Sequence, residues 1–387
     1  MTKCLGYSKS VSIGLLLFFV SLALPFGAKA QNRDSFAKRY INSLINDTTD
    51  ISKPKFIAYP TLAYAPETSW EFGFSGLYVY FANRDTTNRL SEINGFSFIT
   101  LENQYGFWFD HALYTHENKW FFLGRIRLQD FPLRYYGIGP YTTPSHTAVI
   151  EATQVNIRER VLRKVYKDLF VGLQGDWQQL RFARFTSIDQ EEFEFPLGGE
   201  GSLNIGLGLN VVYDTRHNVL NVRDGLFSEL AFLRYPGLAS NYNFSTLISD
   251  NRIYRPVGKN NVLAAQVMGQ FNFGNTPFNM LSLMGGENLM RGYYLGRFRD
   301  NNQIATQVEF RFLPLPLNFT NRIGAALFAS TASVFDEFEN FSVSKFVFAG
   351  GGGLRFLLFP KRDIYTRFDV AFTNEGSGFY LFIGEAF

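Results

Sequence analysis

Long segments in which apolar and polar side chains alternate recur through this chain from Lys55 onward. In residues 201–213, leucine, isoleucine, valine and tyrosine occupy every second position, and mostly asparagine and glycine lie between them. The segments 119–130, 302–313 and 362–373 repeat the pattern, with charged residues on the polar side. Because successive side chains of a strand point to opposite faces, this period predicts strands with one apolar and one polar face.

The length of these segments indicates which kind of β-protein they build. Alternation alone also fits a soluble sandwich with one wet face. The segments run for about 10 residues or more, which is the length that a tilted strand needs to cross a bilayer. Strands of soluble proteins average roughly five or six residues. Long strands with one charged face and one Phe-, Leu- and Ile-rich face therefore favour a barrel with a polar lumen and a lipid-facing exterior.

We count sixteen such segments, and an even number suits a closed barrel in which no strand edge meets lipid. The expected fold is all-β: a closed antiparallel 16-stranded transmembrane β-barrel over residues 55–387. Residues 155–166 are also compatible with a helix by their charge spacing, which would change the count by one hairpin. The segments lie at 56–65, 70–81, 93–102, 105–116, 119–130, 148–163, 167–183, 201–216, 224–237, 243–255, 260–273, 302–313, 320–333, 344–357, 362–373 and 378–387.

The first 30 residues have the organisation of a Sec-type secretory signal peptide. Lys3 and Lys9 precede an apolar stretch over residues 11–24, and Ala28-Lys29-Ala30 forms an expected cleavage site. The alternative is a membrane anchor, but the apolar stretch is shorter than the roughly 20 residues that a spanning helix needs. We therefore expect cleavage after residue 30 and export to the cell outer membrane.

Residues 31–54 are expected to form a short periplasmic segment before the barrel. Asp34 can cap a helix over residues 34–46, in which Phe36, Tyr40 and Leu44 share one face. Cys4 is the only cysteine and lies in the part that is expected to be removed. The mature chain would then have no thiol for a disulfide or a metal site.

Composition agrees with a membrane barrel and excludes other classes. The chain has 43 Phe and 20 Tyr, yet its mean hydropathy is only -0.07. Many aromatic residues without a long apolar run are expected of a barrel with a lipid face and a wet interior. The net charge of +3 is too small to imply nucleic-acid binding.

An outer-membrane lipase or acyltransferase is the enzyme alternative. It would need a serine, a histidine and an orienting polar group that meet in space. None of the four histidines lies in a G-x-S-x-G elbow, and no His, Asp and Glu residues have metal-ligand spacing. We therefore expect no catalysis, no cofactor and no metal, and we interpret His217 as a loop or rim residue.

Three connections, 131–147, 184–200 and 274–301, are long and rich in Gly, Pro and polar residues, and we expect them on the extracellular side because periplasmic turns are short. The third contains Arg291-Gly292-Tyr293. This motif resembles the Arg-Gly-aromatic signature of the long sixth loop in BamA/TamA-type proteins (the bacterial surface antigen family), which includes outer-membrane insertases and two-partner secretion transporters. The resemblance implies that this loop folds into the lumen and that Arg291 binds an inward acid, here Glu309.

The sequence departs from the family pattern at the expected second acid. That position aligns with Ser330, so the resemblance leaves Asp336 and Asp369 as possible secondary acidic partners of Arg291. An unpaired arginine in a lumen is expensive, so a carboxylate partner is physically required. Gly292 would let the backbone turn closely beside the arginine.

Three further stretches resemble the family. Residues 55–70 resemble its first hairpin, and residues 207–225 resemble its GLGL, YDTR and DG stretch. The C-terminus resembles a β-signal, the terminal strand that the assembly machinery reads, through Phe379, Ile383, Gly384 and Phe387.

The junction of the first and last strands, the seam, carries Pro60 and Phe387. Proline cannot donate to a ladder and is tolerated only at edges and bulges. A weak seam would suit lateral opening or strand exchange with a client. The alternative is a bulge at the rim of the barrel.

Family insertases and transporters carry periplasmic POTRA domains, whereas residues 31–54 are too few for an ordinary domain. The resemblance therefore implies a non-enzymatic role in insertion or translocation of outer-membrane proteins, as an accessory to a POTRA-bearing insertase, with outer-membrane lipid around the barrel. The alternative is a stand-alone gated channel. Its candidate ion-selective strip, which is also interpretable as a charge network that fixes the loop, comprises Arg125, Arg127, Arg158 and Arg160.

Overall fold

The computed structural model describes residues 50–387 except 66–68, 102–103, 131, 146–147 and 189–193. The expected signal peptide and the helix at 34–46 lie outside these residues. Within them the chain is all-β, with a few single-turn 3-10 helices. None of the helices in this part of the chain has the length and apolar character needed to cross a membrane.

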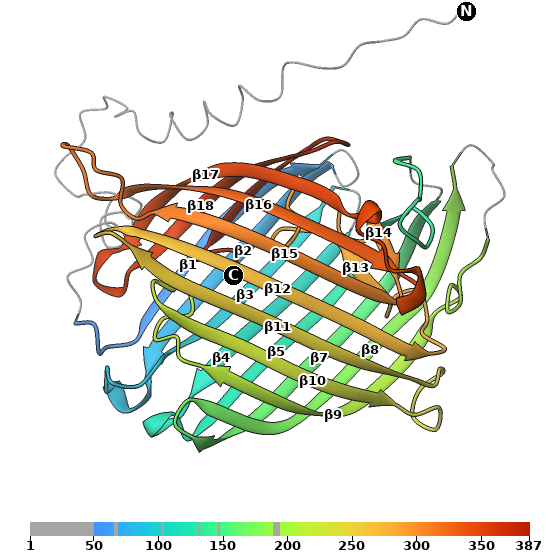
Figure 1. Cartoon of the computed structure of the whole chain (residues 1–387), viewed down its shortest axis with the longest axis horizontal. Coiled ribbons are helices and arrows are strands. Elements are labelled where there is room, and N and C mark those ends of the chain that lie inside the picture. Colours follow the sequence, from blue (N-terminus) through green and yellow to red (C-terminus); the bar gives the residue numbers. More distant parts are fainter. Residues whose placement is uncertain (1–49, 66–68, 102–103, 131, 146–147, 189–193) are drawn as a thin grey trace, which may run out of the picture. The chain divides into compact units, whose positions relative to one another are not determined.

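Sixteen long strands of 7 to 19 residues follow one another as antiparallel neighbours (Figure 1). A short strand, β6 (Leu133–Tyr135), adds to the edge of β7, so seventeen strands share one sheet. The long strands are β1 (Lys55–Ala65), β2 (Ser69–Phe81), β3 (Leu90–Thr100), β4 (Tyr105–Tyr114), β5 (Trp120–Asp130), β7 (Ala148–Tyr166), β8 (Leu169–Ser187), β9 (Ser202–Asp214), β10 (Gly225–Tyr235), β11 (Phe244–Val257), β12 (Asn261–Gly274), β15 (Asn302–Phe312), β16 (Ile323–Phe335), β17 (Val347–Phe359), β18 (Ile364–Thr373) and β19 (Ser377–Ile383).

Each of the sixteen predicted segments overlaps one of these strands. The segment with helical charge spacing is strand throughout as part of β7, because its apolar residues at every second position pack on the neighbouring strands. The last segment was predicted to run to Phe387, and this is wrong. The strand β19 ends at Ile383, since Gly384 has a φ of 88° and turns the chain out of the ladder.

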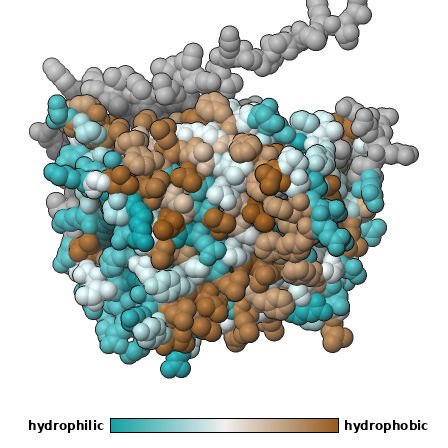
Figure 2. Space-filling model, viewed as in Figure 1, coloured by the Kyte–Doolittle hydropathy of each residue, from teal (hydrophilic) through white to brown (hydrophobic). Residues whose placement is uncertain are grey.

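The two faces of the sheet differ as the alternation predicts. On β9, Leu207 and Leu209 are 72% and 63% exposed, whereas Asn204 and Asn210 are fully buried. We call the face with buried side chains the inner face, because the curled sheet encloses it, and the other the outer face (Figure 1). Figure 2 shows apolar residues gathered over much of the visible outer surface. At the start of β18, directly after Asp363 with its φ of 53°, Ile364 departs from the alternation and is buried in an apolar cluster with Phe359.

The two ends of the sheet differ in their connections. One end, the turn end, carries the connection between β9 and β10 and other mostly short turns, such as 115–119 and 258–260. The other end, the loop end, carries the three long connections, the third of which contains a small hairpin of β13 (Ser282–Met284) and β14 (Phe298–Asp300). Ladders join each long strand to the next from β1 to β19, but no ladder between β1 and β19 occurs in the described residues.

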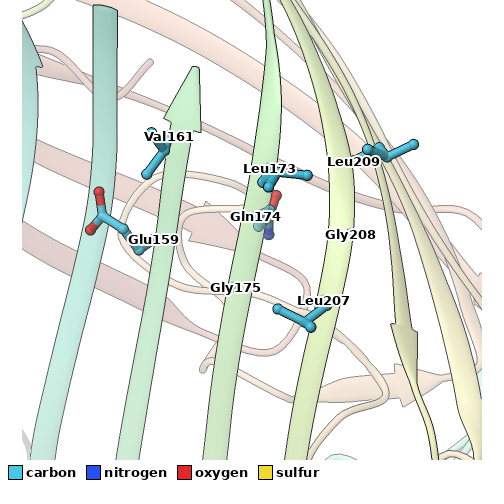
Figure 3. A pocket seen from close by; sticks show the side chains of 8 residues that line it. All are labelled: Glu159, Val161, Leu173, Gln174, Gly175, Leu207, Gly208 and Leu209. Atoms are coloured by element: carbon cyan, nitrogen blue, oxygen red, sulfur yellow. The ribbon is translucent and has the colours of Figure 1, made fainter. Parts of the chain in front are cut away.

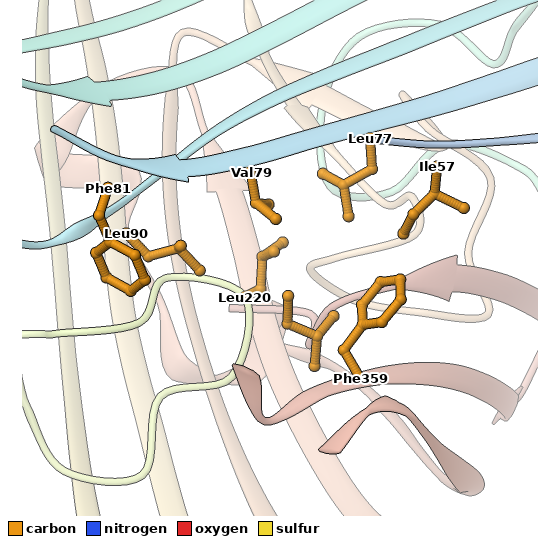
Figure 4. Packing of buried hydrophobic residues seen from close by; sticks show 8 residues of the cluster. Ile57, Leu77, Val79, Phe81, Leu90, Leu220 and Phe359 are labelled. Atoms are coloured by element: carbon orange, nitrogen blue, oxygen red, sulfur yellow. The ribbon is translucent and has the colours of Figure 1, made fainter. Parts of the chain in front are cut away.

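An apolar cluster lies at the turn end, on the inner face (Figure 4). It combines Ile57 of β1 with residues of β2, β3, β17 and β18 and with Leu220 of the β9–β10 connection. The first strands of the sheet (β1 to β3) and two of its last strands (β17 and β18) thus share one cluster with the β9–β10 connection, which joins strands from the middle of the sheet.

Candidate functional site

The candidate site is a buried charge network centred on β15. The alternation of this strand turns Gln307, Glu309 and Arg311 to the inner face, where their exposures are 2%, 0% and 0%. Val308, between them, is 43% exposed on the outer face. Since an isolated charge at such a position is costly, each of these charged groups needs a partner.

Arg291, in the long connection between β12 and β15, binds two of these acids. Its Nη2 lies 2.6 Å from Oε2 of Glu309, and its Nη1 lies 2.6 Å from Oδ2 of Asp369 on β18. The guanidinium also lies 3.5 Å from the ring centroid of Phe328 on β16. One side chain of the loop therefore contacts three strands of the wall through two short ion pairs and a cation–π contact.

The network extends to the C-terminal residues. Arg355 of β17 binds Asp369 at 2.6 Å and Glu385 at 2.9 Å, and Arg311 binds Glu309 at 2.7 Å. The four buried arginines and three acids of this network are Arg291, Arg311, Arg355 and Arg367, with Glu309, Asp369 and Glu385. The excess of arginines means that each acid is shared, which makes the acids the more critical members.

Gly292 and Tyr293 fix the loop beside Arg291. Gly292 has a φ of 106° and donates its N–H to the hydroxyl of Tyr380 on β19 at 2.9 Å. A Cβ there would lie 2.7 Å from Cγ2 of Thr373, so both backbone conformation and space require glycine. The Tyr293 hydroxyl donates to Oδ1 of Asn374 at 2.5 Å.

Of the two possible secondary acids, the structure places only Asp369 beside Arg291. Asp336 follows the end of β16, at the loop end, and is not near the network. Its carboxylate accepts hydrogen bonds from the Asn340 amide at 2.9 and 3.0 Å, which lower its pKa. The inclusion of Asp336 was therefore wrong, because β16 ends before it can turn to the inner face. Ser330 is buried on the inner face and donates to the carbonyl of Ala349.

Three charged residues that follow the motif were not predicted as site residues. Arg297 binds Glu375 in the connection between β18 and β19 at 2.5 Å. Arg299 is 3% exposed and lies over the rings of Tyr135 and Phe278. Burial raises the pKa of Asp300 to about 6. The only available signal was the spacing of Arg297 and Arg299 on either side of Phe298, since charged residues at every second position indicate a strand.

The structure places the two predicted seam residues differently. Pro60 is exposed on β1, the first strand of the sheet, and lies opposite Phe74 in the β1–β2 ladder. Phe387 is only 5% exposed and packs among Tyr254, Val262 and Val222 on the inner face. Phe379 and Ile383 belong to β19, where Phe379 is 65% exposed.

The four arginines of the candidate strip have local partners. Arg125 and Arg127 bind Asp110 at 3.2 and 2.6 Å. Arg158 binds Asp176 at 3.0 Å, and Arg160 binds Glu229 at 2.8 Å. The inner-face acids Glu309 and Asp369 and the turn residue Asp363 lie elsewhere in the sheet and bind other arginines.

One ion pair lies on the outer face. Nε2 of His111 on β4 is 3.2 Å from Glu159 on β7, across Gly124 of β5. Any Cβ at Gly124 would overlap both side chains, so glycine is needed for the pair to form. Beside Glu159, leucines of β8 and β9 surround a shallow hollow of about 510 Å³ over Gly175 (Figure 3).

The other two described histidines, His116 and His217, lie in different connections. His116 lies in the turn after β4, His217 lies in the β9–β10 connection with its ring 6.2 Å from that of Phe81, and His146 lies outside the described residues. No group of three or more His, Cys, Asp and Glu residues that could hold a metal occurs in the described part of the chain.

Comparison with protein families decides what kind of barrel carries this network. Residues 102–387 match the model of the Omp85 superfamily domain, which is most of the chain. The chain belongs to the Omp85 superfamily. It is therefore a bacterial outer-membrane β-barrel of the BamA/TamA type, as the motif around Arg291 predicted.

Solved structures of Omp85 proteins share this fold. BamA from Haemophilus ducreyi lacking POTRA domains 1–3 has a TM-score of 0.51 at 12% identity, over 85% of this chain and 69% of that one. CdiB from Escherichia coli has a TM-score of 0.51 at 10% identity, over 85% and 61%. CdiB from Acinetobacter baumannii has 0.50 at 9%, over 85% and 59%. This chain thus spans about three fifths of the CdiB chains, and no curated protein sequence is significantly similar to it.

Proposed function

We propose that this Omp85 protein takes part in the insertion or translocation of outer-membrane proteins, and that it does so at the junction of β1 and β19 and not by catalysis. The observation that carries the proposal is the contrast between two possible routes for a client, one through the interior of the barrel and one between its end strands. Arg291 of the long connection is held at the inner face through buried ion pairs, whereas the two end strands share no ladder in the described residues.

The interior route is unfavourable as long as the loop is in place. Moving Arg291 out of the interior would break its ion pairs with Glu309 and Asp369. These two acids would then be paired only with the remaining arginines of the network. Breaking a buried pair in this way costs about 3–5 kcal/mol. We infer that residues 274–301 act as a plug locked by Arg291, Gly292, Tyr293, Glu309 and Asp369.

The end strands offer the other route. An unpaired strand edge exposes N–H and C=O groups that another extended segment can pair with. Pro60 in β1 removes one donor from that strand. These features support strand exchange or lateral passage of a client at the seam, with Phe379, Ile383 and Gly384 as part of the signal that guided assembly of the barrel itself.

An accessory role beside a POTRA-bearing insertase is the form of this function that we favour. The test is a mild-detergent pull-down of the tagged protein from outer membranes, read by mass spectrometry. Stoichiometric recovery with a POTRA-bearing insertase supports the accessory role. Recovery of the protein alone contradicts it and favours a self-contained channel, whose conductance in planar bilayers would then be measured.

A further inference from the structure

We propose that the connection between β9 and β10, residues 215–224, is an autoinhibitory strap. It holds the residues after β19 and the cluster around β1 together, and it must leave before the two end strands can separate or accept another strand. This inference rests on the proposed function, because it treats the junction of β1 and β19 as the working site.

The position of the strap is the first argument. It joins the eighth and ninth of the sixteen long strands, yet residues 217–223 also make contacts with strands and turns far from these two in the sheet. The carbonyl of His217 accepts from the N–H of Leu90 at the start of β3 at 3.3 Å. Arg89 also donates to the carbonyl of Asp214, where the strap begins. A turn that only joined two neighbouring strands would not reach so far.

Leu220 links the strap both to the first strand of the sheet and to the residues that follow the last strand. Its side chain is 8% exposed and belongs to the cluster that contains Ile57 of β1 and Phe359 of β17 (Figure 4). Its carbonyl accepts from the N–H of Glu385, just after β19, at 2.9 Å. One residue of the strap thus contacts the first strand through its side chain and the last strand's continuation through its backbone.

The polar side chains of the strap fix it in this position. Asn218 accepts from the N–H of Leu220 at 3.0 Å and donates to the carbonyl of Arg362 at 2.9 Å. Asn221 donates to Oδ2 of Asp363 at 2.9 Å. Arg223 binds the same carboxylate and donates to the carbonyl of Leu313 at 2.9 Å. These bonds tie the strap to the β17–β18 and β15–β16 turns rather than to its own strands.

The backbone bond to Glu385 explains why the strap would inhibit. The N–H of Gly384 still bonds to the carbonyl of Tyr365 on β18, at 2.8 Å. The next N–H along the chain, that of Glu385, is the donor that the strap occupies. Pairing of an incoming extended segment with β19 beyond Ile383 would require the chain to straighten at Gly384, which would carry the Glu385 N–H to the edge of the sheet and away from Leu220. The strap and a client that pairs along this strand therefore compete for the same N–H.

The test compares hydrogen–deuterium exchange of the full chain in lipid nanodiscs for two weakened variants. Asn218→Ala with Asn221→Ala removes only polar contacts, and Leu220→Ala removes the apolar one. The loss of the three hydrogen bonds that these two side chains make predicts an increase in exchange of roughly ten-fold or more. We expect it at residues 55–60 and 377–387, with no change in the β7–β8 ladder. Leu238→Ala, at a fully exposed position of the β10–β11 connection, is the matched control.

A locked variant keeps the proposal testable if a weakened one fails to fold. Asn221→Cys with Asp363→Cys can form a disulfide, and the only native cysteine is Cys4, outside the described residues. Oxidation should slow exchange at the end strands, and reduction should restore it. The proposal is overturned if the exchange rate at the end strands is unchanged in both the weakened and the locked variants. It is also overturned if the exchange rate rises equally throughout the sheet.

Insertion of a client barrel into liposomes, measured on the same variants, separates this inference from the function on which it rests. If exchange at the end strands rises but the rate of client insertion is unchanged, the strap is supported and the seam is refuted as the working site. Insertion that stops on oxidation and returns on reduction supports both.

Discussion

Arg291 joins β15 to β18, because its two terminal nitrogens contact Glu309 and Asp369 on strands that are three positions apart in the sheet, each at 2.6 Å. The arginine is thus a clamp between the loop and a broad part of the wall. Its removal and the removal of an acid should have different consequences, because the network holds four arginines and three acids.

Arg291→Met leaves three arginines and three acids, so the wall stays balanced while the loop loses its anchor. Glu309→Gln leaves four arginines and two acids. We expect Glu309→Gln to lower the free energy of unfolding by about 3–5 kcal/mol and Arg291→Met to lower it by less. Urea unfolding in detergent micelles, followed by tryptophan fluorescence, measures both.

The same Arg291 variant should raise planar-bilayer conductance and antibiotic leakage, as should Arg291→Ala, because the loop is freed. Arg125→Met is the control, since Arg125 lies on the inner face but its side chain is 59% exposed and its partner Asp110 keeps Arg127. Permeability that stays at the wild-type value in the Arg291 variants would sink the assignment of the loop lock.

A disulfide between β1 and β19 should abolish activity if the seam opens. Cysteine pairs along residues 56–60 and 379–383 would be screened for cross-linking and for rescue of a deletion strain. A disulfide between Phe56→Cys and Tyr78→Cys, neighbours in the β1–β2 ladder, is the matched control and should leave activity unchanged. A fully cross-linked seam variant that still rescues the deletion rules out lateral opening.

Acidification should stabilise the loop hairpin through Asp300. Burial is the largest influence and raises its pKa to about 6, and the nearby Asp336 acts in the same direction, against a hydrogen bond from Asn301 and the charge of Lys345. A raised carboxyl pKa destabilises the folded state when the group is charged, so its contribution improves as the pH falls from about 7 to 4. The difference in thermal midpoint between wild type and Asp300→Asn should shrink over this range, and a constant difference would contradict the prediction.

The outer-face pair of His111 and Glu159 should cost stability in a bilayer. Replacing a hydrogen-bonded polar or charged pair that is removed from water by apolar residues of similar volume often stabilises a protein by about 1–4 kcal/mol. We expect the double change to leucine to stabilise the barrel, and His111→Leu alone to destabilise it, because the carboxylate then faces lipid without a partner. Gly124→Ala should resemble the single variant, since a Cβ would separate the pair. Unfolding from lipid vesicles is the measurement, and a destabilised double variant would be the contrary result.

Much of the fold was predictable because each strand of this barrel carries its own signal. On β15 the alternation alone turned Glu309 inward and Val308 outward, and the structure agrees. For the second acid beside Arg291, the sequence left two candidates, Asp369 and Asp336. Only the structure shows that β16 ends before Asp336. Alternation with a period of two residues predicts the face of the sheet on which a side chain lies, but it does not predict the residue at which the strand ends.

The long-range contacts of the connections could not be predicted. Nothing in residues 215–224 indicates that Leu220 lies beside Ile57, because turns have no period and their targets are distant in sequence. The inward turn of the C-terminus was missed for a similar reason. Gly384 was interpreted as part of a terminal strand, whereas its positive φ takes Glu385 and Phe387 to the inner face.

The contact of Glu385 with Arg355 and Arg311 has a consequence for the order of assembly. The third acid of the network lies near the end of the chain, after every strand of the sheet has been made. Until it docks, four inner arginines share only Glu309 and Asp369, and the loop is held against a wall with a surplus of two positive charges. Docking of the plug is thereby linked to placement of β19, because Glu385 reaches the network only once that strand has joined the sheet.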